Sequence, residues 1–168
     1  MNIITKFTVA SGHEMGVLLM LTRELAIEKF SSLLEQKILD RYITGNFSEQ
    51  ALIAEVNSMS NQWLVVYADD VPAGYARITS KGKRPQVLER KRAIRIADLG
   101  VLNKYPDPAI KNSLLEKCIA VCKAYENTWI NEYTGNPLID LFESKGFIRQ
   151  EGTYESDELP LASVCLIA

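Results

Sequence analysis

The sequence has few cysteines, one histidine and no long hydrophobic run. Its three cysteines form no paired framework, which is typical of a reducing compartment. No apolar run approaches the roughly 20 residues that a membrane helix needs, and no hydrophobic stretch at the N-terminus leads into a cleavage site. His13, far from the cysteines in sequence, does not complete a metal ligand set. We expect a cytoplasmic protein with no membrane partner and no bound metal.

A strong charge of one sign is also absent. The formal net charge of −2 does not indicate a nucleic-acid partner. Residues 81–95 nevertheless carry seven basic side chains against one acid, Glu89, so this segment alone has an excess of +6. The segment is either a solvated loop between two strands or a contact for a polyanion such as a nucleotide phosphate.

Length and composition indicate one globular domain over residues 1–168, with 47% apolar and 24% charged residues. Ser11 and Ser48 are placed as helix N-caps, and Asp69-Asp70 as a hairpin turn. Hydrophobic periodicity predicts helices over 12–30, 33–42 (ending near Gly45), 49–59, 108–125 and 137–145. It predicts strands over 3–9, 63–67, 73–78, 93–101, 129–133, 147–154 and 161–167. This order predicts an α/β fold with a mixed sheet and helices on both faces, and a ligand crevice after Val101.

Four stretches, in this order and spacing, resemble the GNAT superfamily of N-acetyltransferases, which use acetyl-coenzyme A (acetyl-CoA). They are FSEQALIAEVN with WLVVYADDVPAGYARI, then IRIADLGV, KNSLLEKCIAVCKAYE and NPLIDLFESKGF. The resemblance implies a GNAT-like, partly splayed sheet and acetyl transfer from acetyl-CoA to a small amine or a protein amine. The spacing is most similar to the branch that acts on spermine and spermidine, and the resemblance also allows for a homodimer.

The resemblance implies a set of residues that bind coenzyme A (CoA). The pantetheine arm would lie against the backbone of the central strand and near an asparagine, and the pyrophosphate would lie on the following helix N-terminus. The implied residues are Leu99, Gly100, Val101, Asp107, Ala109, Ile110, Lys111, Asn112 and Asn136.

The pyrophosphate loop departs from the family pattern. Its three glycine positions hold Asp107, Ala109 and Lys111, and Pro106 and Pro108 stiffen it. Asp at the N-cap followed by Pro at N1 is typical of a self-contained helix start. An alternative function therefore stays open, in which the chain has lost CoA and is a non-catalytic binding or regulatory module.

The usual catalytic groups are also displaced. The two family positions for a base, six and four residues before Val101, hold Arg95 and Ala97. Asp98 is the adjacent candidate base, but strand alternation turns it to the opposite face unless a bulge intervenes; otherwise it is a locally paired carboxylate. Phe142 replaces the usual tyrosine acid.

Three neighbouring residues are candidates for the missing acid, and each has packing or surface exposure as its alternative. Tyr133 is the candidate proton donor, and Glu132 and Tyr105 are nearby alternatives.

Two further groups of side chains have alternative explanations. Several acids could line a cleft for a cationic amine or could form a solvated hairpin tip: Glu132, Glu151, Glu155, Asp157 and Glu158. The cysteines are expected to pack as small core hydrophobes: Cys118, Cys122 and Cys165.

Overall fold

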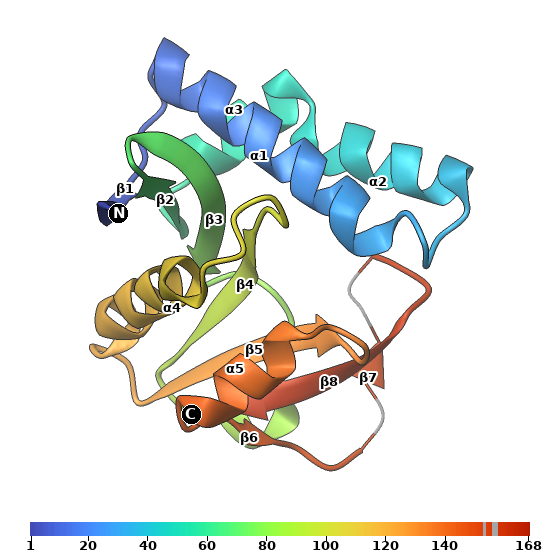
Figure 1. The fold of residues 1–168 in the computed structure, drawn as a ribbon. Helices are drawn as coiled ribbons and strands as arrows, with labels where there is room; N and C mark the ends of the chain where they lie inside the picture. The colour runs from blue at the N-terminus through green and yellow to red at the C-terminus, as the bar shows by residue number, and fades with distance from the viewer. Residues whose placement is uncertain (153, 156–157) are drawn as a thin grey trace.

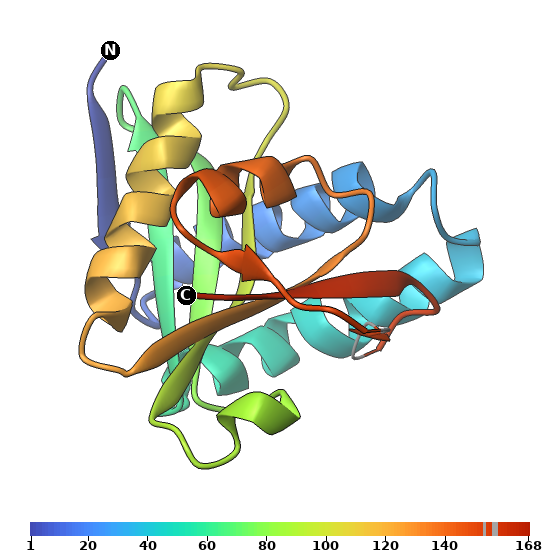
Figure 2. The same cartoon turned by 90° about the horizontal axis from the view of Figure 1, so that it is seen from below.

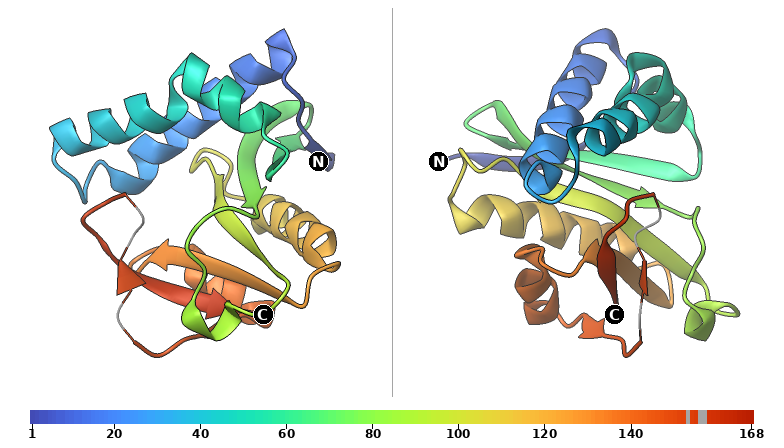
Figure 3. Two further views of the ribbon diagram at one scale, coloured as in Figure 1. Left: turned by 180° about the vertical axis from the view of Figure 1, so that it is seen from behind. Right: turned by 90° about the vertical axis from the view of Figure 1, so that its right-hand side faces the viewer.

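The computed structural model describes residues 1–152, 154–155 and 158–168. A mixed eight-stranded sheet, ordered β1-β2-β3-β4-β5-β8-β6 with β7 also paired to β8, lies between two layers of helices (Figure 1). Helices α1–α3 cover one face and α4 and α5 cover the other (Figure 3). The strands are β1 (Ile3–Phe7), β2 (Asn61–Ala68), β3 (Val71–Thr79), β4 (Ala93–Val101), β5 (Asn127–Tyr133), β6 (Ile148–Arg149), β7 (Tyr154–Glu155) and β8 (Ala162–Ile167). The predicted α/β fold is confirmed.

The N-terminal helices are α1 (Gly12–Phe30), α2 (Gln36–Phe47) and α3 (Glu49–Asn57). Ser11 Oγ accepts a hydrogen bond from the Glu14 N–H, and Ser48 Oγ accepts one from the Ala51 N–H, so both predicted N-caps are confirmed. The predicted end of the second helix near Gly45 is wrong. Gly45 lies within α2, and the chain turns only at Ser48, whose extended backbone ends α2 and caps α3.

The hairpin between β2 and β3 has the predicted turn. Asp69 and Asp70 both have positive φ, 49° and 67°, as a type I′ turn requires. Gly74 on β3 allows β4 to approach closely, since an added Cβ would lie 2.3 Å from the Gly100 carbonyl oxygen. The hairpin is therefore fixed against the central strand.

Strands β4 and β5 are parallel and hydrogen-bond only at their start, over three pairs that end at Arg95↔Trp129. Beyond these pairs the two strands diverge (Figures 1 and 2). On its other edge β4 pairs with β3, and the register shifts so that Arg77 faces Asp98 while Ile78 faces Ile96. Ala97 is thus an extra residue, a bulge, in β4. The predicted partly splayed sheet is confirmed.

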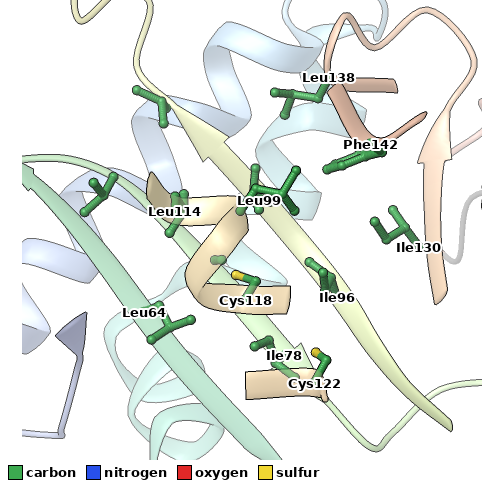
Figure 4. Packing of buried hydrophobic residues seen from close by; sticks show 14 of the residues in the cluster. Leu64, Ile78, Ile96, Leu99, Leu114, Cys118, Cys122, Ile130, Leu138 and Phe142 are labelled. Carbon is green, nitrogen blue, oxygen red and sulfur yellow. The ribbon is translucent and has the colours of Figure 1, made fainter. Parts of the chain in front are cut away.

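Two large cores and one smaller cluster fill the layers. Figure 4 shows the core on the α4 (Pro108–Cys122) and α5 (Leu138–Ser144) face, to which Leu99, Leu138 and Phe142 belong. Cys118 and Cys122 lie in this core and Cys165 lies in a third, smaller cluster, so all three cysteines are buried thiols as predicted.

The predicted strand over 147–154 is instead two short strands, β6 and β7, both paired with β8. Gly152, with φ of +114°, lies between them in a conformation outside the strand region. Among the described residues, no helix is both long and apolar enough to cross a bilayer.

Candidate functional site

A cavity of about 130 Å³ lies at the divergence of β4 and β5, on the face covered by α1 and α2. The strands β2 to β5, both helices and the segment before β8 contribute to its wall. Its aromatic members are Phe30, Tyr42, Phe47, Trp63 and Tyr133. Its charged members are Lys29, Arg77, Arg95, Asp98, Glu132 and Glu158.

The bulge at Ala97 decides the orientation of Asp98. It shifts the alternation of β4 by one residue, so Asp98 joins Arg95 in the wall of the cavity. One Asp98 oxygen accepts a hydrogen bond from Lys29 Nζ at 2.9 Å, and the other accepts one from the Tyr75 hydroxyl. Lys29 Nζ also donates to the Leu99 carbonyl at 3.0 Å. Asp98 is therefore a locally paired carboxylate that also lines the cavity.

Electrostatics keep this pair ionised. Burial opposes the charge on Asp98, but the Lys29 ammonium and the hydrogen bond from Tyr75 hold the pKa of Asp98 below its ordinary value. Burial likewise opposes the charge on Lys29, but Asp98 and then Glu132 raise the pKa of Lys29 above its usual range. Tyr75 has a raised pKa because of its burial and the adjacent Asp98 charge.

Glu132 is the carboxylate on the opposite strand. Burial raises the pKa of Glu132, and the nearby Lys29 charge only partly offsets this. Its Oε1 accepts a hydrogen bond from the Tyr133 N–H at 3.2 Å, and within the described residues it forms no ion pair. A partly buried carboxylate with a raised pKa that lines a cavity has the properties of a proton acceptor.

Tyr133 lines the same cavity as Asp98, so the structure brings the two predicted catalytic residues together. The Tyr133 ring packs on Phe30 with centroids 5.5 Å apart. Burial raises the pKa of Tyr133, which keeps its hydroxyl protonated at neutral pH. Tyr105 packs against both major cores and is absent from the cavity wall.

Several cations of the basic segment are bound within the protein. Arg84 donates to the carbonyls of Leu88 and Lys91, at 3.2 and 2.6 Å, and so holds the loop that contains a short 3-10 turn. Arg92 stacks on Tyr125, and Arg95 stacks on Trp129 with its guanidinium carbon 4.7 Å from the ring centroid. These contacts hold the predicted loop in place. They also orient the three arginines toward groups of the protein, which disfavours a single shared contact with a polyanion.

The residues implied for the pantetheine arm have mainly structural partners. Leu99 and Val101 are buried in the core beneath α4 and α5. An added Cβ on Gly100 would lie 3.1 Å from Leu25 Cδ2, so this glycine permits close packing of α1. Asn136 is buried, and its Oδ1 accepts a hydrogen bond from the Leu138 N–H at 2.9 Å at the start of α5.

The N-terminus of α4 is capped from within the chain. Asp107 Oδ1 accepts a hydrogen bond from the Ala109 N–H at 3.0 Å, and the Ile110 N–H bonds to the Asp107 carbonyl at 3.1 Å. Pro108 has no N–H, and the Asn112 side chain donates to the Pro108 carbonyl. The predicted self-capped helix start is confirmed, and positions N1 to N3 offer no N–H to an anion. Lys111, one turn into α4, is the cation closest in sequence to this cap.

Sequence reasoning missed Lys29. A signal was available, because Lys29 follows Leu25 by four residues and therefore continues the buried face of α1. Of the predicted cleft acids, Glu132 and Glu158 line the cavity, and Asp157 lies outside the described residues. The described residues contain no group of three or more ligands that could hold a metal ion.

Comparison with known proteins identifies the fold. No family model matches the sequence. The PaiA N-acetyltransferase of Thermoplasma acidophilum, solved with CoA, is similar with a TM-score of 0.75, 13% identity and 98% coverage of both chains. A GNAT-family acetyltransferase of Streptococcus pneumoniae has a TM-score of 0.68, 15% identity and 99% coverage of both chains. Arabidopsis thaliana Naa50, solved with a bisubstrate analogue, has a TM-score of 0.61 and 18% identity over 98% of this chain and 97% of its own. The chain therefore has the fold of the GNAT acetyltransferases.

Proposed function

We propose that this protein is an acetyl-CoA-dependent N-acetyltransferase that acts on a small amine or a protein amine. The observation that carries the proposal is the cavity where β4 and β5 diverge, with the Glu132 carboxylate in its wall. Two similar structures support the choice of donor, since one was solved with CoA and the other with a CoA-containing bisubstrate analogue.

Glu132 is the proposed proton acceptor. An amine must lose a proton before or as it attacks the donor, and acetyl-CoA supplies a thioester that is already activated for this attack. Because burial raises its pKa, Glu132 binds a proton more readily than an ordinary carboxylate does. Asp98 is less suited to this role, since its ion pair with Lys29 lowers its pKa.

Lys29, Asp98 and Tyr133 have supporting roles in this proposal. Asp98 fixes the Lys29 ammonium beside the β4 backbone, where its charge keeps the Glu132 pKa from rising further. Tyr133 is the proposed proton donor to the leaving thiolate, because its hydroxyl stays protonated and its side chain lines the cavity. This assignment keeps Tyr133 in its predicted role and makes Asp98 a positioning residue.

The protein offers a suitable site for the pantetheine arm of CoA but not for its pyrophosphate. The divergence of β4 and β5 leaves a stretch of β4 without a strand partner on that side, which suits an extended pantetheine arm. The N-terminus of α4 does not suit a pyrophosphate, because its first amides are already bonded and Asp107 adds a negative charge.

This misfit favours the second candidate function, a GNAT-fold binding or regulatory module without CoA. The Asp107 cap supports this second function, but it is also compatible with an acetyl-CoA molecule that the protein holds mainly by the pantetheine arm. The two functions therefore differ in one measurable property, namely whether acetyl-CoA binds at all.

The test is calorimetric titration of the full chain with acetyl-CoA, followed by mass spectrometry of a panel of amines incubated with acetyl-CoA and protein. Saturable binding below roughly 1 mM and an acetylated product are expected. Binding of neither acetyl-CoA nor CoA at that concentration would contradict the proposal and favour the module. Desulfo-CoA, which keeps the pyrophosphate and lacks the thiol, controls for binding that cannot lead to transfer.

A further inference from the structure

One polar group in the cavity has no part in the proposed transfer, namely the hydroxyl of Tyr42 on α2. Tyr42 is partly buried and lines the same cavity as Glu132. Among the described residues the Tyr42 hydroxyl has no hydrogen-bond partner, and it is not one of the unpartnered polar atoms that are sealed from solvent. A hydroxyl that is both free and accessible can donate one hydrogen bond to a ligand and accept others from it.

The Tyr42 ring is held in place by two phenylalanines. It meets Phe30 with the ring planes at 88° and Phe47 with the planes at 79°, and both pairs of centroids are 5.7 Å apart. Edge-to-face contacts of this kind are preferred by aromatic pairs. Phe30 also packs on Tyr133, the residue that follows Glu132 on β5. Tyr42 is therefore fixed on the α2 side of the cavity, and Glu132 belongs to its β5 side.

The surroundings of this hydroxyl favour a cation over an anion. Burial first, and then the Asp98 carboxylate, raise the pKa of Tyr42, so the hydroxyl stays protonated at neutral pH. Asp98 has a larger effect on this pKa than the opposing charge of Lys29 has. Glu158 likewise has a larger effect on the pKa of Tyr42 than Arg77 has. Carboxylates thus outweigh cations at the hydroxyl, and such a place attracts an ammonium ion and repels an oxyanion.

An acceptor amine has more than one N–H group to satisfy. A primary ammonium ion has three N–H donors, and the proposed proton acceptor Glu132 takes the proton that leaves. A protonated tyrosine oxygen keeps its lone pairs, so the Tyr42 oxygen can accept a hydrogen bond from a second N–H. A contact that is present both before and during attack contributes to the KM of the amine rather than to kcat.

We propose that Tyr42 is an acceptor-binding residue, whose hydroxyl oxygen accepts a hydrogen bond from the acceptor amine while Glu132 accepts the proton that leaves. The proposal rests on the proposed acetyl transfer for the identity of the amine as the acceptor. It adds a binding contact to that reaction and no step in which a bond or a proton is exchanged. The contact requires an N–H on the ligand, so a quaternary ammonium ion cannot make it.

The direct test observes the Tyr42 side chain in the full chain without acetyl-CoA. Carbon-13 at Cζ labels the seven tyrosines for NMR, and the signal that is missing from Tyr42→Phe belongs to Tyr42. The probe is ethylammonium chloride, which has N–H donors, and tetramethylammonium chloride provides the same charge without them. The Tyr42 signal is expected to shift saturably with ethylammonium and to stay in place with tetramethylammonium. A signal that ethylammonium does not move, or that both salts move equally, would overturn the proposal.

The variant Tyr42→Phe also measures what the hydroxyl contributes, because it keeps the ring and its contacts with Phe30 and Phe47. It should raise the KM of an amine that the protein acetylates by at least about tenfold, the effect of a hydrogen bond to a charged group. The kcat and the KM of acetyl-CoA should stay unchanged. An unchanged KM of the amine, or a fall in kcat alone, would contradict the proposal.

The matched control is Tyr67→Phe. Tyr67 is also partly buried, and its hydroxyl also has no hydrogen-bond partner among the described residues. Its ring likewise lies beside a cation, with Lys6 Nζ 4.6 Å from the centroid, but Tyr67 lies outside the cavity wall. Tyr67→Phe should change neither the kinetics nor the Tyr42 signal. Equal changes in the two variants would show a general effect of a lost hydroxyl and would overturn the proposal.

The two measurements separate this proposal from the proposed function. Acetyl transfer with an unchanged KM of the amine in Tyr42→Phe would leave the acetyltransferase intact and refute the role of Tyr42. A shift of the Tyr42 signal that depends on an N–H, in a protein that does not bind acetyl-CoA, would refute the acetyltransferase and leave an amine-binding site at Tyr42.

Discussion

The cavity beside β4 and the N-terminus of α4 differ in how their polar groups are satisfied. In the cavity, Arg77 Nε is buried without a hydrogen-bond partner, and Glu132 has no ion pair, within the described part of the chain. At α4, the Asp107 side chain and carbonyl accept from the Ala109 and Ile110 N–H groups. Buried polar groups without partners cost free energy that a ligand can recover, whereas satisfied groups gain nothing from one. The cavity wall therefore keeps unsatisfied polar groups, whereas the α4 terminus is satisfied by its own cap.

The largest expected effect tests the cavity side of this comparison. Glu132→Gln removes the proposed proton acceptor and keeps the shape of the side chain. Loss of a general base lowers the turnover rate by about 10²- to 10⁴-fold. Steady-state kinetics with acetyl-CoA and an amine should show this fall. In the wild type, activity should fall as the pH drops through the raised pKa of Glu132, and this step should vanish in the variant.

Stability distinguishes this catalytic role from a structural one. The pKa of Glu132 in the folded protein lies above its ordinary value of 4.5. The favourable contribution of Glu132 to folding stability is therefore present below pH 4.5, and it is lost as the pH rises through the pKa of the folded state. Removing the carboxyl should therefore leave the protein at least as stable at neutral pH. A variant that loses both activity and stability would show that Glu132 supports the fold instead. Glu126→Gln, on an exposed side chain, is the control.

The second prediction concerns the partly buried ion pair. Lys29→Met leaves the Asp98 carboxylate without its cation. Breaking a fully buried pair costs about 3–5 kcal/mol, and we expect a loss of up to this size here. Urea denaturation should measure this loss, and Lys29→Met with Asp98→Asn should recover much of it. The surface pair Arg149–Glu143 has the same N···O distance of 2.9 Å. Arg149→Met should nevertheless cost only about 0–1 kcal/mol, because solvent screens that pair.

The pH dependence of stability provides a second measurement of this pair. Asp98 has a lowered folded-state pKa, so its contribution is present above its ordinary value of 3.8 and is lost as pH falls through the folded value. The wild type should therefore lose more stability on acidification than Lys29→Met with Asp98→Asn. Identical acid profiles would show that the pair contributes no net stability.

The same two regions show which parts of the molecule the sequence predicts. The Asp107 cap, the Ser11 and Ser48 caps and the bounds of β4 depend on neighbours within a few residues, and all were predicted. The Lys29–Asp98 pair joins residues 69 apart in sequence, and the one-residue bulge at Ala97 decides that they meet. No local pattern specifies such a register shift. The prediction at Gly45 failed for the opposite reason. A glycine is a local signal for a helix end, but α2 continues through Gly45 and ends only before the turn at Ser48.

The third prediction tests the structural side of the comparison. Asp107→Ala removes the side-chain acceptor of the Ala109 N–H, and loss of such an N-cap costs about 0.5–2 kcal/mol. Thermal denaturation should show a correspondingly lower melting temperature, while amine affinity at the cavity stays unchanged. Ser48→Ala removes an equivalent cap at α3 and should cost a similar amount. A fall in amine affinity for Asp107→Ala alone would show that the two regions are coupled.

The smallest expected effect decides whether α4 contacts CoA at all. Asp107→Gly costs only a few tenths of a kcal/mol as an N-cap, and it removes a negative charge from the proposed pyrophosphate position. If the pyrophosphate lies there, relief of about 1 kcal/mol of repulsion raises CoA affinity about fivefold. The increase should be larger at low salt, where screening is weaker.

Lys111→Ala should lower the affinity with the same salt dependence, since Lys111 is a cation in the first turns of this helix. Calorimetric titration at two salt concentrations measures both variants. Unchanged affinities that do not depend on salt would place the pyrophosphate away from α4, and the Asp107 cap would then be purely structural.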